Sequence, residues 1–274
     1  MAITSFIPTI WSETLLEALN SQYIGVQNCS RDFEGEIKDK GQTVKIGCIG
    51  SVNVFDYTKD TDMDAPETLS DSQITLTIDQ AKEFNFQIDA IDKAQATPKL
   101  MQAAMKQAAS ALADVADRYV YSLYTGALSE NKISVSGLTV DNVVATLASL
   151  RKSMFANSVG NNMPVALEVS PDVAAIIMQA KVLQATDNTD VIENGALGKL
   201  FGFDIYVSPN VVVDGANHMC VARTKRAVAF AAQLNDVEAY RPESRFADAV
   251  KGLHLYGAKI VYPAEYFVLS VSLG

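Results

Sequence analysis

The sequence predicts an α+β fold, in which helices and strands are mixed without a regular β-α-β alternation. Short segments between residues 43 and 89 alternate apolar and polar side chains, which is typical of strands with one solvated face. A long helical pattern follows over residues 97–125, and strand patterns return in the last third of the chain. With 274 residues, 49% of them hydrophobic, the chain can bury one large core or two smaller ones.

The N-terminal segment starts with the apolar stretch FIPTIW and continues as SETLLEALNSQY. Ser12 can cap a short helix that carries Leu15, Leu16 and Leu19 on one side. A helix of this length is not stable alone, so we expect it to pack on something else. Trp11 is the only tryptophan of the chain and is expected to anchor that packing.

Three alternating segments follow, with the sequences QTVKIGC, QITLTID and EFNFQID. The acidic connection DYTKDTDMDAPETLSDS lies between the first two of them. These segments predict a long two-stranded ribbon with an acidic tip. Because such a ribbon buries little surface by itself, we expect it to lie on a neighbour.

The clearest helix is predicted over residues 97–125. Thr97 can cap it, Pro98 suits the first helical position, and Gly126 ends it. Its apolar residues recur at spacings of four and three: Met101, Met105, Ala108, Leu112, Val115, Tyr119 and Leu123. This stripe lasts for only about three heptads and is rich in alanine, so packing on a sheet is favoured over a coiled coil.

The second half of the chain predicts a helix over about 139–157 and a buried strand over 164–170. Pro171 opens a third helix, and residues 184–197 are expected to form a loop. The stretch GKLFGFDIYVSPNV contains a strand at 203–208. Further strands are predicted in HMCVAR, AVAFAAQ, VEAYRPE and the aromatic, β-branched C-terminal segment.

The residue pattern does not favour an enzyme. The chain has no phosphate-binding glycine loop, no dinucleotide motif and no nucleophile elbow. His218 and His254 lie outside any metal motif, and the three cysteines form no CxxC pair. We therefore predict no catalytic, cofactor-binding or metal-binding residues, and free thiols in a reducing compartment.

The acidic tip has one feature of a calcium loop, because Asp60, Asp62 and Asp64 occupy alternate positions. The sixth position is Ala65 instead of glycine, and the twelfth is Asp71 instead of glutamate. A solvated tip is therefore favoured over a cation site. The carboxylates can also pair with basic residues on an adjacent chain.

The formal net charge of −10 argues against a protein that grips nucleic acid through its phosphates. The densest basic run, Arg223-Thr-Lys225-Arg226, is interpreted as a solvated turn. If this turn faces a pore of an assembly, it can meet phosphate or an acidic neighbour. No apolar run approaches the roughly 20 residues of a membrane span, and no basic segment typical of a signal peptide precedes Arg31.

The N-terminal segment, the ribbon and the long helix would all leave apolar area or strand edges uncovered in a monomer. In their order and spacing they resemble the major capsid proteins of tailed bacteriophages, whose fold was first described for phage Hong Kong 97. The resemblance covers nearly the whole chain and depends on no single motif. Its matching pieces are FIPTIWSETLLEAL, KGQTVKIGCIGSVNVFDY, DKAQATPKLMQAAMKQAASALADVADRYVYSLY, GALGKLFGFDIYVSPNV and FADAVKGLHLYGAKIVYPAEYFVLSV.

The resemblance implies an α+β fold of the Hong Kong 97 type. It divides the chain into an N-terminal arm (1–33), an extended β-hairpin or E-loop (34–90), a peripheral domain with the spine helix (91–163 and 237–274) and an axial domain (164–236). The strand at 203–208 would belong to the central sheet of the axial domain.

The function implied by the resemblance is structural. Hexamers and pentamers of the chain would form an icosahedral head around double-stranded DNA, assembled in the host bacterial cytoplasm. A separate scaffolding protein is expected because the chain starts at the arm; a portal and a possible decoration protein are further expected partners. An acidic inner wall would let packaged DNA slide. Covalent crosslinking is not predicted, because no acceptor for Lys59 is recognisable.

Two groups of contact residues are predicted. Intersubunit contacts are expected at Asp56, Lys59, Asp60, Asp62, Asp64 and Trp11, and an axial pore region at Arg223, Lys225 and Arg226. Two alternatives remain open. One is an encapsulin-like shell protein of a cellular compartment, and the other is a soluble enzyme or binding protein with an unrecognised site.

Overall fold

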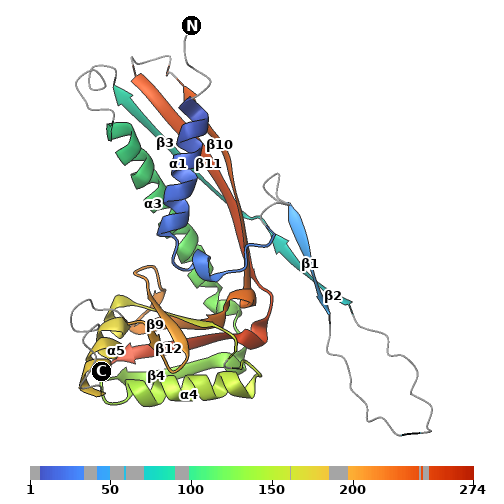
Figure 1. Ribbon diagram of the computed structural model, residues 1–274, viewed down its shortest axis with the longest axis vertical. Coiled ribbons are helices and arrows are strands. Elements are labelled where there is room, and N and C mark those ends of the chain that lie inside the picture. The colour runs from blue at the N-terminus through green and yellow to red at the C-terminus, as the bar shows by residue number, and fades with distance from the viewer. Residues whose placement is uncertain are drawn as a thin grey trace.

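The computed structural model describes residues 7–33, 42–49, 59, 71–89, 99–160, 162–184, 197–240, 242 and 247–274. These residues form two units and a projecting ribbon (Figure 1). The elongated unit contains α1, α3, β3, β10 and β11. The compact unit contains β4–β9, β12, α4 and α5. The ribbon of β1 and β2 extends from the side of the elongated unit.

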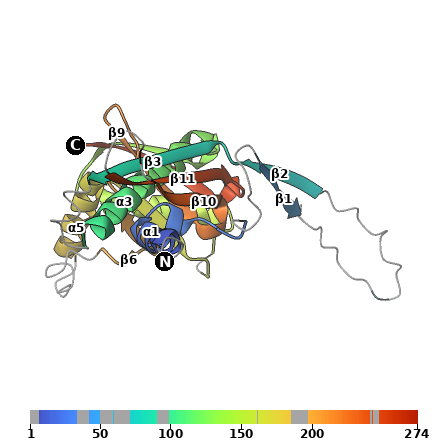
Figure 2. The same cartoon turned by 90° about the horizontal axis from the view of Figure 1, so that it is seen from above.

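The elongated unit is a three-stranded antiparallel sheet covered by two helices. Its strand order is β10 (Val228–Tyr240), β11 (Ala247–Ile260) and β3 (Gln80–Asp89). Figure 2 shows α1 (Ile7–Gln22) and α3 (Lys99–Ser122) on the same face of this sheet. The core between them contains Leu15, Leu19, Tyr23, Met105, Ala109, Leu112, Ala116, Phe230 and Tyr256. The N-terminal helix therefore packs on its own chain.

Helix α3 confirms the long helix predicted from the sequence, and a 3-10 turn (Leu123–Gly126) follows it. Its most buried side chains differ from the predicted stripe, however. Ala108, Val115 and Tyr119 are half-buried. The fully buried positions are Met105, Ala109, Leu112, Ala113, Ala116, Val120 and Tyr121. The helix is covered on two sides, because it touches both α1 and the strands, and its alanines allow that close approach.

The ribbon consists of β1 (Thr43–Ile49) and β2 (Asp71–Thr77), paired from Thr43 with Thr77 to Ile49 with Asp71. Its base rests on the face of the β10–β11 pair opposite to the helices, since alternate residues of these strands enter two different cores. This third core contains Val44, Ile46, Leu76, Ile78, Ala229, Ala231 and Leu255. The third alternating segment, β3, pairs with β11 and so belongs to the elongated unit.

The compact unit is a seven-stranded mixed sheet with two helices on one face. The strand order is β4 (Lys132–Leu138), β12 (Tyr266–Leu273), β9 (Asn217–Thr224), β5 (Val165–Val169), β7 (Phe203–Val207) and β6 (Lys199–Leu200), with β8 (Val213–Asp214) paired to β9. Helices α4 (Val143–Ala156) and α5 (Pro171–Gln184) bury Leu147, Leu150, Met154, Val173 and Ile177 against Leu167, Phe203 and Leu269.

The two units do not follow the predicted domain ranges. Residues 132–156 and 266–273 were expected in the peripheral domain, but β4, α4 and β12 share the sheet and core of the compact unit. Strand β12 pairs in parallel with β4 and antiparallel with β9. In addition, β10 starts at Val228 and continues through both of the strands predicted there, with a register shift between Asn235 and Glu238. These pairings join segments that are distant in sequence, so no local pattern reveals them.

Candidate functional site

A group of buried charged and polar side chains lies where the elongated unit meets the compact unit. At its centre, Arg223 of β9 and Glu168 of β5 are both completely buried. The guanidinium is bidentate: Nη2 donates to Glu168 Oε1 at 2.8 Å and Nε to Oε2 at 3.1 Å. A buried charge is tolerated only when it is paired and hydrogen-bonded, and this geometry provides both.

The same guanidinium also binds the segment after α1. Nη2 donates to the Gly25 carbonyl at 2.7 Å, and Nη1 lies 3.0 Å from Cys29 Sγ. Burial raises the pKa of the Cys29 thiol, although Arg223 opposes this rise. The thiol is therefore protonated and inert near neutral pH. The sulfur atom of Cys29 therefore accepts a hydrogen bond from Arg223 and does not act as a reactive thiolate.

We call residues 23–30 the strap, because they bind both units. From the compact side, Asn28 Nδ2 donates to Glu168 Oε1 at 3.0 Å. From the elongated side, Asp117 of α3 accepts the backbone N–H groups of Ile24 and Val26, each at 2.9 Å. Burial raises the pKa of the Asp117 carboxyl, and the backbone hydrogen bonds oppose that rise.

The strap is also tied to the long sheet by two backbone hydrogen bonds. The N–H of Ser30 donates to Val228 at 2.9 Å, and the N–H of Phe230 donates to Ser30 at 2.8 Å. A 3-10 turn, Val26–Asn28, lies between the two sets of contacts. A second connection joins the units nearby: Arg118 Nε donates to Asn210 Oδ1 at 3.0 Å. The junction is thus a structural contact between the two units, and the charges of Arg223 and Glu168 are paired within it.

The interpretation of Arg223 as part of a solvated, pore-facing turn is wrong. Its side chain is completely buried and its charge is used by Glu168, so it cannot meet phosphate or an acidic neighbour. The two basic residues that follow lie in another element, the 3-10 turn Lys225–Ala227, and both are exposed. Their position near an axial pore stays a prediction.

Arg226 is bound within its own chain. Its Nε lies 3.0 Å and 2.9 Å from the two carboxylate oxygens of Glu265, and its Nη2 also binds Glu265. Glu265 accepts a further hydrogen bond from the Thr224 hydroxyl. Burial works to raise the pKa of Glu265, but the hydrogen bonds from Arg226 and Thr224 outweigh it and lower that pKa. Arg226 remains more than half exposed even so, and Lys225 beside it is exposed as well.

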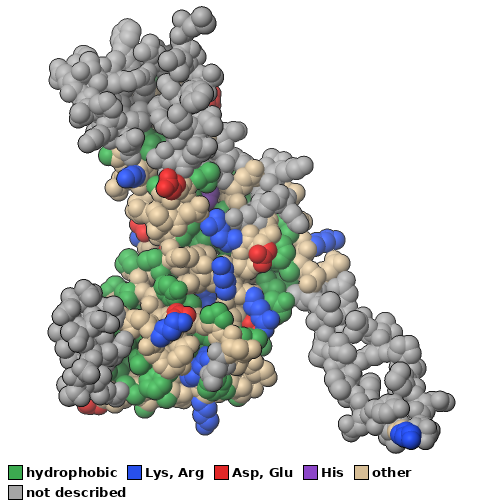
Figure 3. All heavy atoms as spheres, in the orientation of Figure 1, with side chains coloured by type: hydrophobic (Ala, Val, Ile, Leu, Met, Phe, Trp, Pro, Cys, Tyr) green, Lys and Arg blue, Asp and Glu red, His purple; other side chains and the backbone are tan. Residues whose placement is uncertain are grey.

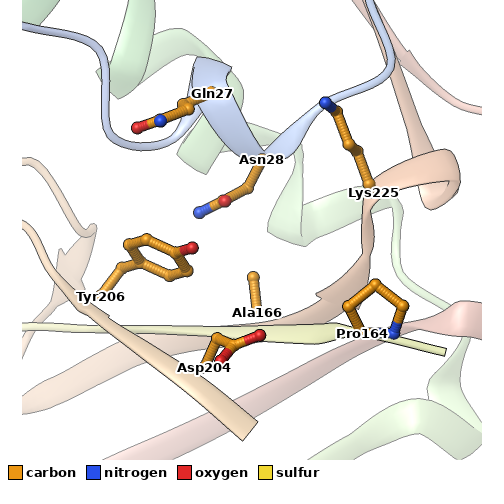
Figure 4. A pocket seen from close by; sticks show the side chains of 7 residues that line it. All are labelled: Gln27, Asn28, Pro164, Ala166, Asp204, Tyr206 and Lys225. Carbon is orange, nitrogen blue, oxygen red and sulfur yellow. The ribbon is translucent and has the colours of Figure 1, made fainter. Parts of the chain in front are cut away.

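Lys225 lies at the rim of a cleft of about 250 Å³ beside the strap. Figure 4 shows Asn28 and Tyr206 pointing into it from opposite walls, with Asp204 and Ala166 on its floor. The remaining lining residues are Gln27 and Pro164. This set combines one amine, one carboxylate, a phenol and amides.

Most of the predicted intersubunit residues lie outside the described residues: Asp56, Asp60, Asp62 and Asp64. Trp11 lies on α1, but its side chain is also outside the described part. Lys59 is exposed. Within the described ranges, no group of three or more His, Cys, Asp or Glu side chains could hold a metal ion. No described helix is long and apolar enough to cross a membrane.

The buried junction was missed from the sequence, although a signal was present. Glu168 interrupts the apolar stretch PVALEVS, and Arg223 interrupts HMCVAR. One unpaired charge in each of two buried strands predicts an ion pair between them, because neither can be buried alone. Asp117 gave no comparable signal, since acidic residues are common on helices.

The phage capsid protein family matches residues 72–268, which is more than half of the chain. The chain belongs to the phage capsid protein family. The role of this major capsid protein is structural, and the family places it in the virion capsid. The fold class predicted from the sequence is confirmed, and the buried junction is part of the framework of a shell subunit.

Solved structures agree with the family. A protein of Mycobacterium phage Che8 is 26% identical, with a TM-score of 0.70 over 90% of this capsid protein and 91% of that chain. The capsid of cyanophage P-SCSP1u is 14% identical, with a TM-score of 0.65 over 86% and 85% of the two chains. A virus-like particle from Pyrococcus furiosus is 14% identical, with a TM-score of 0.59 over 94% and 96%. The last two show likeness of fold alone. No curated protein matches the capsid protein.

Proposed function

We propose that this capsid protein assembles as hexamers and pentamers that close into an icosahedral head around double-stranded DNA. The observation that carries the proposal is the ribbon. Only its base packs on the elongated unit, and the paired ends at Ile49 and Asp71 project away from the body (Figure 1). A projecting two-stranded ribbon is stable only when another surface covers it, and in a shell that surface is a neighbouring copy.

In this assembly the elongated unit corresponds to the peripheral domain and the compact unit to the axial domain. The ribbon corresponds to the E-loop. Its acidic tip, with Asp56, Asp60, Asp62 and Asp64, would pair with basic residues of an adjacent subunit, and Lys59 with an acidic one. Trp11 would contact a neighbour from α1, and Lys225 and Arg226 would lie near the axis of a capsomer.

The assembly pathway would take place in the host bacterial cytoplasm. A scaffolding protein and a portal are the expected partners, and a decoration protein is a further one. DNA would be enclosed without sequence-specific binding. The formal net charge of −10 supports this view, since an acidic wall does not hold DNA phosphates.

The charges on the described surface of the subunit bear on the hypothesis that the inner wall of the shell is acidic. Figure 3 shows Lys and Arg side chains gathered down the middle of the face that carries α1. If that face lines the shell, the described part of the inner wall is basic and the acidic-wall hypothesis is overturned. The orientation of a subunit in a reconstructed shell decides this.

An encapsulin-like shell of a cellular compartment is the second candidate. The likeness in fold to the Pyrococcus furiosus virus-like particle favours it, whereas the family match favours a phage head. The genes beside the coding sequence separate the two. Terminase and portal genes indicate a phage head, and a gene for an enclosed enzyme indicates a compartment.

Negative-stain electron microscopy of the purified chain, together with its mass by light scattering, tests the proposal. Closed shells, or rings of five and six subunits, are the expected result. The shell diameter then begins to separate a phage head from a smaller compartment. A stable monomer at all salt and protein concentrations, even with a candidate scaffold present, would overturn the proposal.

A further inference from the structure

The hairpin of β6 and β7 forms one edge of the compact sheet and carries an unusual turn. Leu200 pairs with Phe203, so the loop between the strands is Phe201-Gly202. Both loop residues have positive φ angles, 51° and 78°. Two-residue hairpin loops of this kind favour Asn-Gly, because asparagine and glycine tolerate positive φ. Phenylalanine is a poor residue for the first position, and its bulk makes the conformation strained.

The side chain of Phe201 is only partly covered within the subunit, because the residue is 42% exposed. Strained residues of this kind are held in place where they serve a contact.

A second exposed aromatic residue lies close to this turn. Phe155, near the end of α4, is 46% exposed, and its ring centroid is 4.5 Å from the guanidinium carbon of Arg151. The turn approaches the same guanidinium: a β-carbon at Gly202 would lie 3.5 Å from Arg151 Nη2. Arg151 also lies over the ring of the buried Phe203, at 5.5 Å from its centroid. Arg151 thus lies over the ring of Phe155 and also against the turn that carries Phe201.

We propose that Phe155 and Phe201 form an aromatic patch that a second copy of this chain covers during assembly. The inference rests on the proposed function, and it names residues that would contribute contact energy between subunits. The partner is argued from two features. Capsid proteins assemble with copies of themselves, and among the described residues β6 is the last strand on its side of the sheet, where another chain can make contact.

The composition of the patch also fits a contact between proteins. Rigid aromatic side chains with an adjacent arginine are typical of residues that dominate binding energy at interfaces. The two strands of the hairpin are connected by backbone pairing of Lys199 with Asp204 and of Leu200 with Phe203. A patch that is already ordered loses little conformational entropy on binding.

The substitution Phe201→Asn separates the role in assembly from the role in folding. Asparagine suits the positive φ, so the melting temperature of the unassembled subunit should stay the same or rise. The protein concentration at which half of the chain assembles should increase about tenfold or more, as for loss of an interface anchor. Phe201→Tyr keeps the ring and should assemble like the wild type.

Leu128→Gln is the matched control, because Leu128 is 45% exposed on the loop before β4, outside the patch. Phe155→Gln should impair assembly in the same direction as Phe201→Asn. Light scattering against protein concentration measures assembly, and thermal unfolding of dissociated subunits measures stability.

Three results would overturn the inference. The first is assembly of Phe201→Asn at the wild-type concentration, and the second is a lowered melting temperature, which would mean that the ring packs inside its own chain. The third is normal self-assembly with a defect only when a scaffold is added, which would assign the patch to that other protein. A wild-type chain that never assembles would instead overturn the proposed function, so the two failures are distinguishable.

Discussion

A β-carbon placed on Gly257 would lie only 2.3 Å from the backbone carbonyl oxygen of Thr77. The end of β2 therefore rests directly on the backbone of β11, and it does so where the ribbon joins the elongated unit. No side chain fits between them, because the opposing atoms belong to rigid backbone.

Gly257→Ala should lift the ribbon from the sheet. The added methyl group would also meet Ile78 Cα at 3.1 Å, so β2 must move and open the core around Leu76. We expect a loss of about 1–3 kcal/mol in the free energy of unfolding. Urea unfolding measures it, and limited proteolysis should cut the ribbon faster. Gly126→Ala is the control, since its nearest neighbour would be a flexible side-chain atom of Ile260 at 3.5 Å.

Arg223→Met should be strongly destabilising, because it leaves the Glu168 carboxylate buried without its charged partner. The expected loss is about 3–5 kcal/mol in the free energy of unfolding. Adding Glu168→Gln should recover part of it by removing the stranded charge. Chemical unfolding of the two single variants and the double variant gives the coupling energy. Equal losses in Arg223→Met and in the double variant would contradict this account.

The exposed ion pair of Lys251 and Glu238 provides the comparison. Both side chains are more than half exposed and 2.8 Å apart. Lys251→Ala should change the stability little, because solvent screens such pairs.

His254 should make the subunit less stable in mild acid. Burial, with the nearby positive charge of Arg31, lowers the pKa of His254 to about 4, whereas an unfolded histidine has a pKa of about 6.5. The unfolded state therefore binds the proton first. The stabilising effect of the neutral ring is complete above pH 6.5 and is lost as the pH falls toward 4. His254 should therefore lower the free energy of unfolding by about 3 kcal/mol between pH 6.5 and pH 4.

Urea unfolding between pH 4 and pH 7 tests this, with His254→Asn as the comparison. The wild type should lose more stability than the variant across that window. The variant keeps His218, so any dependence of the free energy of unfolding on pH that the two proteins share arises from groups other than His254. Parallel curves would show that the buried ring of His254 does not titrate as expected.

Asp117→Asn should loosen the strap. The carboxylate accepts the N–H groups of Ile24 and Val26, and an amide offers one acceptor and one donor in its place. One N–H group would lose its partner, at a cost of about 1–3 kcal/mol. Hydrogen exchange should quicken at residues 24–26. Lys106→Gln, at an exposed position of the same helix, should leave their exchange unchanged.

Local patterns predicted the individual elements well. The capping residues and apolar spacing of α3, and the alternation of β1, β2 and β3, depend on neighbours in sequence. The stripe on α3 was misjudged because α1 and the sheet cover the helix on two sides. Ala109, Ala113 and Ala116 are therefore core residues, although alanine carries little hydrophobic signal.

The joint between the units could not be predicted in the same way. Arg223, Lys225 and Arg226 are close in sequence, yet Arg223 lies in a buried strand and the other two lie in an exposed turn. Which face a strand residue occupies depends on the sheet it joins, and that sheet is formed by long-range pairing. The contact residues at the ribbon tip stay a prediction.

The position of β12 has a consequence for biosynthesis. This strand lies between β4 and β9 and is made after every other strand of its sheet. Until β12 has been synthesised, no strand connects β4 to β9, so the sheet of the compact unit stays incomplete. A polypeptide that stops before residue 266 therefore lacks the strand that unites its compact unit. Such a product would expose the edges of β4 and β9 that β12 covers in the complete chain.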